Sequence, residues 1–172
     1  MSALSTISAL YQTIDQATES LIQTRFVTMR AQDVPQVVAV ENTIYAFPWT
    51  AGNFSDSLQA GYTVTLLLNQ RNVLLGYFVL MCAVDEMHLL NLSVAQQHQG
   101  QGYGTQLLQH IFETSHTVGK QRILLEVRPS NPRAVALYIR SGFTQIGVRK
   151  GYYPAHASTR EDALVMEKLL CP

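Results

Sequence analysis

The chain has 172 residues, of which 47% are hydrophobic and 14% are charged, and its formal net charge is zero. A chain of this length usually forms one domain, and this composition is typical of a globular protein rather than a disordered one. The balanced charge argues against a nucleic-acid binder that works by neutralising phosphates, so we expect no direct nucleic-acid binding.

The two cysteines, Cys82 and Cys171, form no pattern of a disulfide framework or a zinc site, and the histidines lack metal-ligand spacing. We therefore expect free thiols and no bound metal. No apolar run approaches the length of a membrane span, and no basic residue precedes Arg25 as a signal peptide would require. These features predict a cytoplasmic protein that does not bind membranes.

Residues 1–24 are predicted to form an extension before one domain at residues 25–170. Apolar residues in the extension recur at spacings of three and four, which favours a helix with an apolar stripe. They are Leu4, Ile7, Tyr11, Ile14 and Leu21. Such a helix can pack on the domain or on a partner, or it can be a frayed extension.

The first half of the domain is predicted to contain a strand, two helices and three further strands. The expected elements are a strand at 26–30, a helix from Asp33 to about Tyr45, a short helix between Thr50 and Gly61, and strands at 62–68, 73–84 and 87–94. Asp33 and Thr50 suit helix N-caps, and Gly61 suits a helix end. The polar residues 69–72 predict a hairpin turn.

The second half is predicted to alternate helices and strands. The expected elements are a helix at 105–117 ended by Gly119, a strand at 122–128, a helix opened by Asn131-Pro132 and ended by Gly142, and strands at 143–149 and 162–169 around an aromatic and polar loop. The order β-α-α-β-β-β-α-β-α-β-β predicts an α/β (α+β) fold on a mixed, mostly antiparallel sheet.

A glycine-rich turn joins the predicted strand at 87–94 to the predicted helix at 105–117. Its glycines alternate at positions 100, 102 and 104, so no side chain there blocks the approach of a ligand to the backbone. The helix start adds free N–H groups and the positive end of a helix dipole, which favours a phosphate or pyrophosphate. The alternative is a glycine-rich surface turn. The spacing fits neither a dinucleotide-binding fingerprint nor a P-loop.

The turn does match the pattern Gln/Arg-x-x-Gly-x-Gly/Ala through Gln99, Gly102 and Gly104. In this it resembles the pyrophosphate loop of the GCN5-related N-acetyltransferase (GNAT) superfamily. The resemblance implies the GNAT fold, with helices on both faces of the sheet, and acetyl-CoA as cosubstrate.

Further blocks resemble one branch of that family, the bacterial ribosomal-protein alanine acetyltransferases. The largest runs from Glu126-Val127-Arg128 through Asn131 and Leu137-Tyr138 to Gly142-Phe143. Two others are Phe47-Pro48-Trp49 and Tyr152-Tyr153-Pro154, the latter with Arg160-Glu161-Asp162-Ala163. The resemblance covers about residues 26–169. It implies an N-α-acetyltransferase whose partner is the N-terminal alanine of a small-subunit ribosomal protein.

The resemblance also implies roles for individual residues. Glu126, a carboxylate in an apolar strand, takes the proton of the attacking amine, and Tyr138 protonates the departing thiolate. The cofactor-binding residues are Leu92, Val94, Gln99, Gly100, Gln101, Gly102, Tyr103, Gly104, Thr105 and Asn131. The predicted walls of the acceptor slot are Phe47, Trp49, Tyr152 and Tyr153. The simpler interpretations are a solvent-facing glutamate, a core tyrosine and ordinary aromatic packing.

One departure from the family concerns the loop, where members commonly have an arginine and this chain has Gly100. The sequence contains no lysine or arginine between Arg71 and Lys120. The phosphates would then depend on backbone amides and the helix dipole, helped by His98 or Arg133. Two rival hypotheses remain: acetylation of lysine side chains or a small amine, and a non-catalytic acyl-CoA-binding module.

Overall fold

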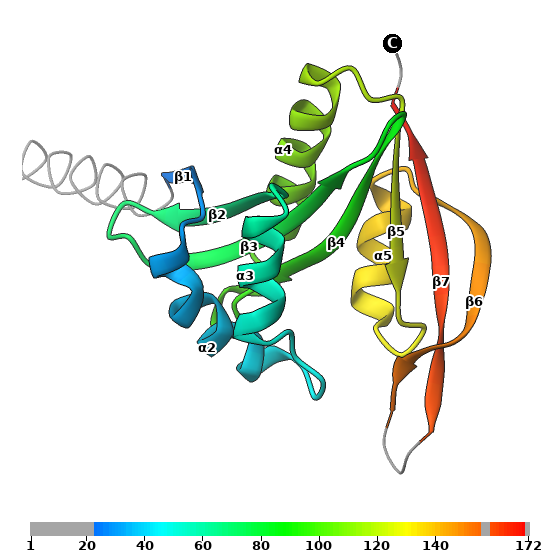
Figure 1. Cartoon of the computed structure of the whole chain (residues 1–172), viewed down its shortest axis with the longest axis horizontal. Helices are drawn as coiled ribbons and strands as arrows, with labels where there is room; N and C mark the ends of the chain where they lie inside the picture. Colours follow the sequence, from blue (N-terminus) through cyan, green and yellow to red (C-terminus); the bar gives the residue numbers. More distant parts are fainter. Residues whose placement is uncertain (1–22, 156–158, 171–172) are drawn as a thin grey trace, which may run out of the picture.

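The computed structural model describes residues 23–155 and 159–170, which form a seven-stranded sheet with helices on both faces (Figure 1). The strands lie in the order β1-β2-β3-β4-β5-β7-β6. Strands β4 and β5 are parallel, and every other neighbouring pair is antiparallel. The predicted fold class is therefore confirmed. The predicted N-terminal helix lies outside the described residues.

The central strands are apolar on both faces because both faces are covered. The strands are β1 (Thr24–Thr28), β2 (Thr63–Asn69), β3 (Leu74–Cys82), β4 (Glu86–Val94), β5 (Arg122–Val127), β6 (Thr144–Pro154) and β7 (Arg160–Leu169). The predicted hairpin between β2 and β3 is present. There the Asn69 side-chain oxygen accepts hydrogen bonds from the N–H groups of Arg71 and Val73, both at 2.9 Å.

The four helices predicted within the domain are present, and two short 3-10 turns accompany them, at Ala31–Asp33 and Gln96–His98. The helices are α2 (Val34–Ile44), α3 (Ala51–Gln59), α4 (Tyr103–Thr117) and α5 (Pro132–Arg140). Thr50 and Asn131 cap α3 and α5 as predicted. The predicted side-chain cap of Asp33 on α2 is wrong, because its carboxylate accepts the Arg30 N–H, at 2.8 Å, across the first 3-10 turn. In the described part of the chain, no helix is long and apolar enough to span a bilayer.

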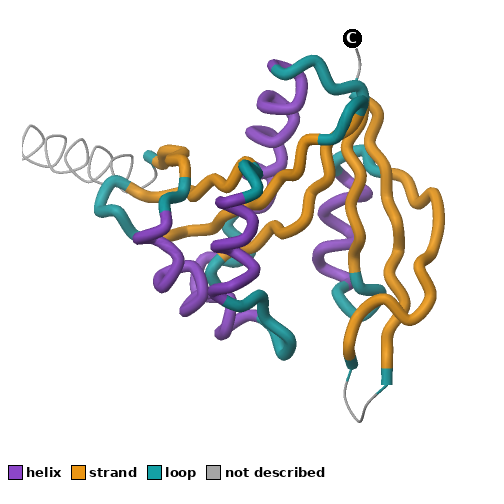
Figure 2. Tube along the Cα trace, in the orientation of Figure 1, coloured by secondary structure: helices purple, strands orange, loops and turns teal. Residues whose placement is uncertain are grey.

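Helices α2 and α3 cover one face of the sheet, and α4 and α5 cover the other (Figures 1 and 2). Successive strand residues point to opposite faces, which builds two separate cores from one strand. On β3, Tyr77 and Val79 pack with α2 and α3, while Phe78 and Leu80 pack with α4 and α5. Strands β5, β7 and β6 extend beyond α2 and α3 (Figure 2).

Strands β4 and β5 are paired only near one end and then diverge (Figure 1). Their parallel register runs from Glu86–Arg122 to Leu89–Leu125. The next residue of β4, Leu90, is bulged, because Val79 pairs with Asn91 while Leu80 pairs with Leu89. A bulge bends its strand and raises its local twist. The bend therefore coincides with the point where β4 leaves β5.

Strand β6 is longer than predicted, since residues 150–154 were expected in a loop. It continues to Pro154, although its register against β7 shifts between Arg149 and Tyr153. Polar contacts from β7 hold this irregular stretch: the Asp162 carboxylate accepts from the Gly151 N–H at 2.9 Å, and Arg160 donates to the Tyr152 carbonyl oxygen at 2.6 Å. Charged side chains of β7 thus replace part of the backbone hydrogen bonding between the two strands. Local sequence patterns do not reveal such contacts between strands.

Gly76 of β3 is expected to be essential for packing. A Cβ atom there would lie 2.6 Å from the Ser93 carbonyl oxygen and 3.0 Å from Leu107 Cδ1. We predict that Gly76→Ala lowers the free energy of unfolding by about 1–3 kcal/mol, as overpacking does. Chemical denaturation measures the change. The control is Gly52→Ala in α3, where the nearest atom is 3.4 Å away; equal effects of the two substitutions would contradict this account.

Candidate active site

A cleft of about 700 Å³ opens on the face formed by α4 and α5, where β4 and β5 diverge. Its walls come from the end of α2, the second half of β4, the glycine turn with the start of α4, and α5. Nine of the ten predicted cofactor-binding residues line it: Leu92, Val94, Gln99, Gly100, Gly102, Tyr103, Gly104, Thr105 and Asn131. The exception is Gln101, whose side chain donates to the Gln97 carbonyl oxygen at 3.2 Å.

The glycine turn requires glycine at two positions for conformational reasons. Gly100 and Gly102 have φ angles of 80° and 89°, in the left-handed region that other residues rarely adopt. Gly102 is the N-cap of α4, and its carbonyl oxygen accepts from the N–H groups of Thr105 and Gln106. The two N–H groups before these, of Tyr103 and Gly104, have no partner within the helix, so the start of α4 presents donors to the cleft.

Gly104 serves close packing rather than backbone conformation. A Cβ atom there would lie 3.0 Å from Leu137 Cδ2 of α5. The two helices therefore approach closely beside the glycine turn. This places α5 as the second wall of the cleft.

Beyond Leu89, β4 has no strand partner on its β5 side among the described residues. The backbone edge at residues 90–94 therefore faces the cleft, and an extended ligand can add to it as another strand would. Tyr45, at the end of α2, lies over this edge: its hydroxyl is 3.0 Å from Ser93 Oγ and 3.4 Å from the Leu92 carbonyl oxygen.

The predicted catalytic residues lie outside the walls of this cleft. Glu126 of β5 is on the sheet face opposite α4 and α5, since its neighbours Leu125 and Val127 belong to the core on the other side. Its side chain is 15% exposed, and its carboxylate lies 3.2 Å from the Arg149 guanidinium of β6. Glu126 is thus partly buried and accessible from the side away from the glycine turn.

Tyr138 of α5 is buried. Burial raises the pKa of its hydroxyl well above the ordinary value, and the nearby Tyr45 and Tyr153 hydroxyls raise it further. Tyr153 is also close enough to Glu126 for that carboxylate to raise the Tyr153 pKa, although burial and Tyr152 contribute more. Tyr153 therefore lies near both predicted catalytic residues, which come from opposite sides of the opened sheet.

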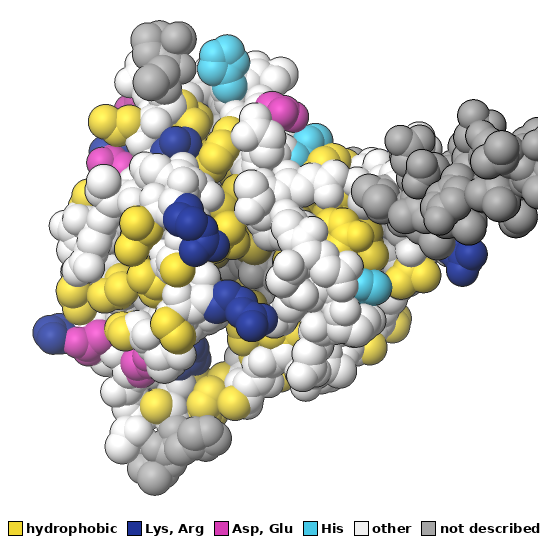
Figure 3. Space-filling model, turned by 180° about the vertical axis from the view of Figure 1, so that it is seen from behind, with side chains coloured by type: hydrophobic (Ala, Val, Ile, Leu, Met, Phe, Trp, Pro, Cys, Tyr) yellow, Lys and Arg dark blue, Asp and Glu magenta, His cyan; other side chains and the backbone are white. Residues whose placement is uncertain are grey.

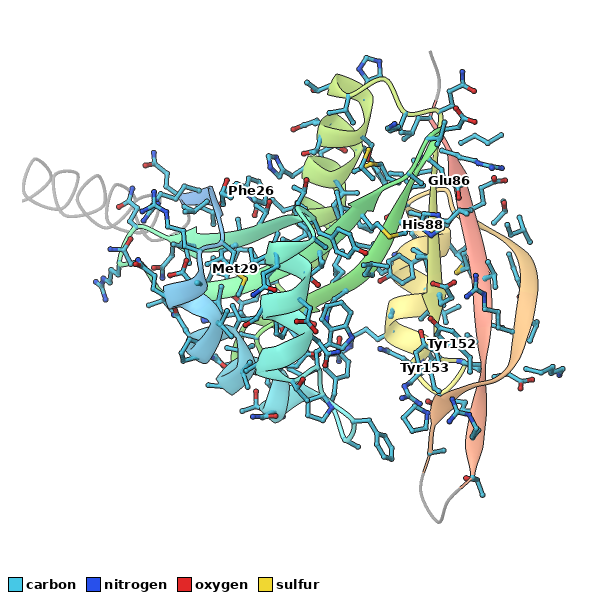
Figure 4. The ribbon with its side chains drawn as sticks, in the orientation of Figure 1. Phe26, Met29, Glu86, His88, Tyr152 and Tyr153 are labelled. Carbon is cyan, nitrogen blue, oxygen red and sulfur yellow. The ribbon has the colours of Figure 1, made fainter. Side chains whose placement is uncertain are left out.

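Two of the four predicted acceptor-slot residues, Phe47 and Tyr153, lie against Arg128, and a third, Tyr152, packs on Tyr153 with the Arg149 guanidinium 5.5 Å from its ring centre. The Arg128 guanidinium lies 4.2 Å from the ring centre of Tyr153 and 5.7 Å from that of Phe47, and Tyr152 packs edge-on against Tyr153 with ring centres 4.9 Å apart. Tyr152 and Tyr153 lie beside the lower end of β5 (Figure 4). Trp49 is separate from this group.

Trp49 packs with the core between α2 and α3 instead. Its ring centre is 5.3 Å from that of Phe54, and its backbone N–H donates to the Glu41 carboxylate at 3.2 Å. This position fixes the loop that carries Phe47. The recorded contacts of Trp49 are therefore those of ordinary aromatic packing, the simpler of the two interpretations given above.

Glu41, a buried carboxylate on α2, was missed by the sequence analysis. It is 1% exposed and accepts hydrogen bonds from the Tyr77 hydroxyl, Asn91 Nδ2 at 3.1 Å and Ser93 Oγ at 3.4 Å, besides the Trp49 N–H. A buried charge requires such partners. The sequence does contain a signal for its burial, because Glu41 lies on the same face of the helix as the apolar residues Val34 and Val37.

A cluster of ion pairs lies at the paired end of β4 and β5. Glu86 contacts His88 at 2.6 Å and Arg122 at 2.7 Å, and these contacts lower the pKa of its carboxyl, the hydrogen bond from His88 contributing most. Figure 4 shows Glu86 and His88 together near the upper end of β4, far from Tyr152 and Tyr153. Within residues 23–155 and 159–170, no group of three or more His, Cys, Asp or Glu side chains could hold a metal ion.

Comparison with known proteins identifies the class of this fold and site. A family model described as the acetyltransferase (GNAT) family matches residues 34–143. The chain belongs to this family and is an N-acetyltransferase. Members of the family use acetyl-CoA as the acetyl donor.

Its relatives narrow the comparison within the family. The chain is 32% identical to the [ribosomal protein bS18]-alanine N-acetyltransferase of Escherichia coli K12 over 139 residues, covering 81% of this chain and 93% of the relative. It is 31% identical to a putative enzyme of the same name from Bacillus subtilis, covering 80% and 90%. The crystal structure of the ribosomal-protein-S18-alanine N-acetyltransferase from Escherichia coli superposes with a TM-score of 0.79 at 29% identity, covering 87% of this chain and 96% of that chain.

The Glu41 cluster yields a stability prediction. Replacing Glu41 with Ala removes the shared acceptor and leaves the buried Tyr77 hydroxyl without its partner. We expect the free energy of unfolding to fall by about 2–4 kcal/mol, from the unpaired donors and the cavity together. Chemical denaturation tests this. Glu113→Ala, at an exposed position on α4, is the control and should change stability by less than about 0.5 kcal/mol; similar losses in both variants would show that the cluster contributes nothing specific.

Proposed function

We propose that the chain is an acetyl-CoA-dependent N-α-acetyltransferase whose acceptor is the N-terminal alanine of a small-subunit ribosomal protein. The observation that carries the proposal is the opening between β4 and β5. A donor cleft with a glycine turn lies on one side of it, and Glu126 with the aromatic group around Arg128 lies on the other. The relatives named for bS18-alanine acetylation supply the acceptor class.

In this proposal, the residues that line the cleft bind the acetyl-CoA. The amides of residues 99–104 and the start of α4 bind the pyrophosphate, and the edge at residues 90–94 pairs with the pantetheine arm. The amide of Leu92 or Val94 donates to the thioester oxygen. A fixed donor aimed at developing charge contributes a factor of roughly 100 or more. Asn131, which caps α5, orients the cosubstrate.

Acetyl-CoA supplies an activated acyl group, and the enzyme moves two protons. The amine nitrogen bonds to the thioester carbon, the carbon–sulfur bond breaks, Glu126 accepts the amine proton through water, and Tyr138 gives its proton to the thiolate. An α-amine with a pKa of about 7.8 costs about 3.5 kcal/mol less to neutralise than a lysine at about 10.4. One carboxylate therefore suits an α-amine better than a lysine. We also propose a cytoplasmic location, since the proposed acceptor is a ribosomal protein.

The direct test is acetyl transfer to a peptide that starts with alanine and also contains a lysine. We expect one added acetyl group by intact mass with the free N-terminus and none when the N-terminus is blocked. Glu126→Gln should lower kcat by roughly 100-fold or more while CoA still binds, because the base is lost. Glu113→Gln is the matched control. Acetylation of the blocked peptide would move the acceptor to a side chain, and CoA binding without any transfer would favour a non-catalytic module.

The raised pKa of Tyr138 gives a pH prediction. Because the hydroxyl stays protonated through pH 9, a proton remains available for the thiolate while the substrate amine deprotonates near pH 7.8. We expect kcat to rise between pH 6.5 and 8.5 and then level off. Tyr138→Phe should lower kcat about 100-fold with the KM for acetyl-CoA unchanged. Tyr62→Phe, outside the site, is the control; a kcat for Tyr138→Phe that equals the wild-type value across this pH range would contradict the assignment of Tyr138 as the proton donor.

A further inference from the structure

The phosphate end of the donor cleft lacks basic residues in its loop, yet the cleft carries positive charge from elsewhere. Two arginines of α5, Arg133 and Arg140, line it together with His98, and among the described residues no aspartate or glutamate is part of the lining. In the space-filling view from behind, basic side chains stand near the centre of the face beside a recess (Figure 3). An anion in this cleft therefore meets guanidinium groups from the helix opposite the loop.

The packing of α5 against α4 brings these arginines to the glycine turn. Leu137 is the residue that approaches Gly104. Arg133 and Arg140 lie four residues before and three residues after Leu137, so all three share one face of α5. The two guanidinium groups therefore stand on either side of the contact with the start of α4.

Neither arginine forms an ion pair with a described carboxylate. Arg133 donates to Gln99 Oε1 at 2.6 Å, and Gln99 in turn donates to the Val94 carbonyl oxygen at 3.2 Å, which ties Arg133 to the loop. Arg140 forms no ion pair with any described residue. Arg122, Arg128 and Arg149, by contrast, each contact a glutamate. A guanidinium without a carboxylate is available for bidentate binding of a phosphate.

We propose that Arg133 and Arg140 bind the pyrophosphate and the 3′-phosphate of CoA, respectively, and replace the arginine that the loop lacks. Arg133, held at the loop by Gln99, contacts the pyrophosphate, and Arg140 contacts the 3′-phosphate. Residues seven apart on a helix are separated by about 10.5 Å along its axis, which suits a ligand with two separate phosphate groups. This inference rests on the proposed function, because it takes CoA as the ligand.

The test compares binding of CoA and of 3′-dephospho-CoA to the full chain by isothermal titration calorimetry. Arg140→Gln should weaken CoA about tenfold and leave 3′-dephospho-CoA unchanged. Arg133→Gln should weaken both ligands about tenfold, because both keep the pyrophosphate. Each loss corresponds to one charge-assisted contact. Arg140→Lys should recover part of the CoA affinity, and higher salt should reduce the difference between wild type and variants.

Arg71→Gln is the matched control, since it removes one arginine from the β2–β3 turn outside the cleft. Unchanged CoA affinity in the Arg133→Gln, Arg140→Gln double variant would overturn the proposal while leaving the acetyltransferase assignment intact. Equal losses for CoA and 3′-dephospho-CoA in Arg140→Gln would overturn the assignment of Arg140 to the 3′-phosphate. Failure of the wild-type chain to bind CoA would instead overturn the proposed function.

Discussion

The short parallel pairing of β4 with β5 is the constraint on which the rest of the site depends. Four residue pairs hold the strands together, and the bulge at Leu90 turns β4 away from β5 beyond Leu89. A sheet that remained paired would have no free edge at residues 90–94 and no passage between its faces. The cleft with the glycine turn therefore lies on one side of the point where this pairing stops, and Glu126 lies on the other.

The Glu41 cluster supports this opening from the face of α2 and α3. Its donors come from the strand that bends and from neighbouring elements: Asn91 and Ser93 on β4, Tyr77 on β3 and the Trp49 backbone after α2. One buried carboxylate thus links the free part of β4 to the loop that carries Phe47. The energy of that cluster holds the site in shape rather than contributing to the chemistry.

The order of elements and most residues that line the cleft could be predicted from the sequence because both depend on local signals. Glycine spacing, the cap at Asn131 and apolar periodicity are short-range patterns. The extension of β6 depends instead on Asp162 and Arg160 of another strand, and Arg140 gains its place through the contact between Leu137 and Gly104. Long-range contacts of this kind leave no local pattern. Glu41 was visible as a charge in an apolar stripe, but its partners were not.

Arg128 joins two segments that are far apart in the sequence, and this bears on how the acceptor specificity of such an enzyme can change. Its guanidinium contacts Phe47 from the loop after α2, and Tyr153, Glu161 and the Pro154 carbonyl oxygen from the last hairpin. Phe47, Tyr153 and Glu161 themselves belong to neither of the two buried cores. Under the proposed function, these contacts lie on the acceptor side of the opening, so substitutions at Phe47 or Tyr153 can alter acceptor choice without changing the residues that line the cleft.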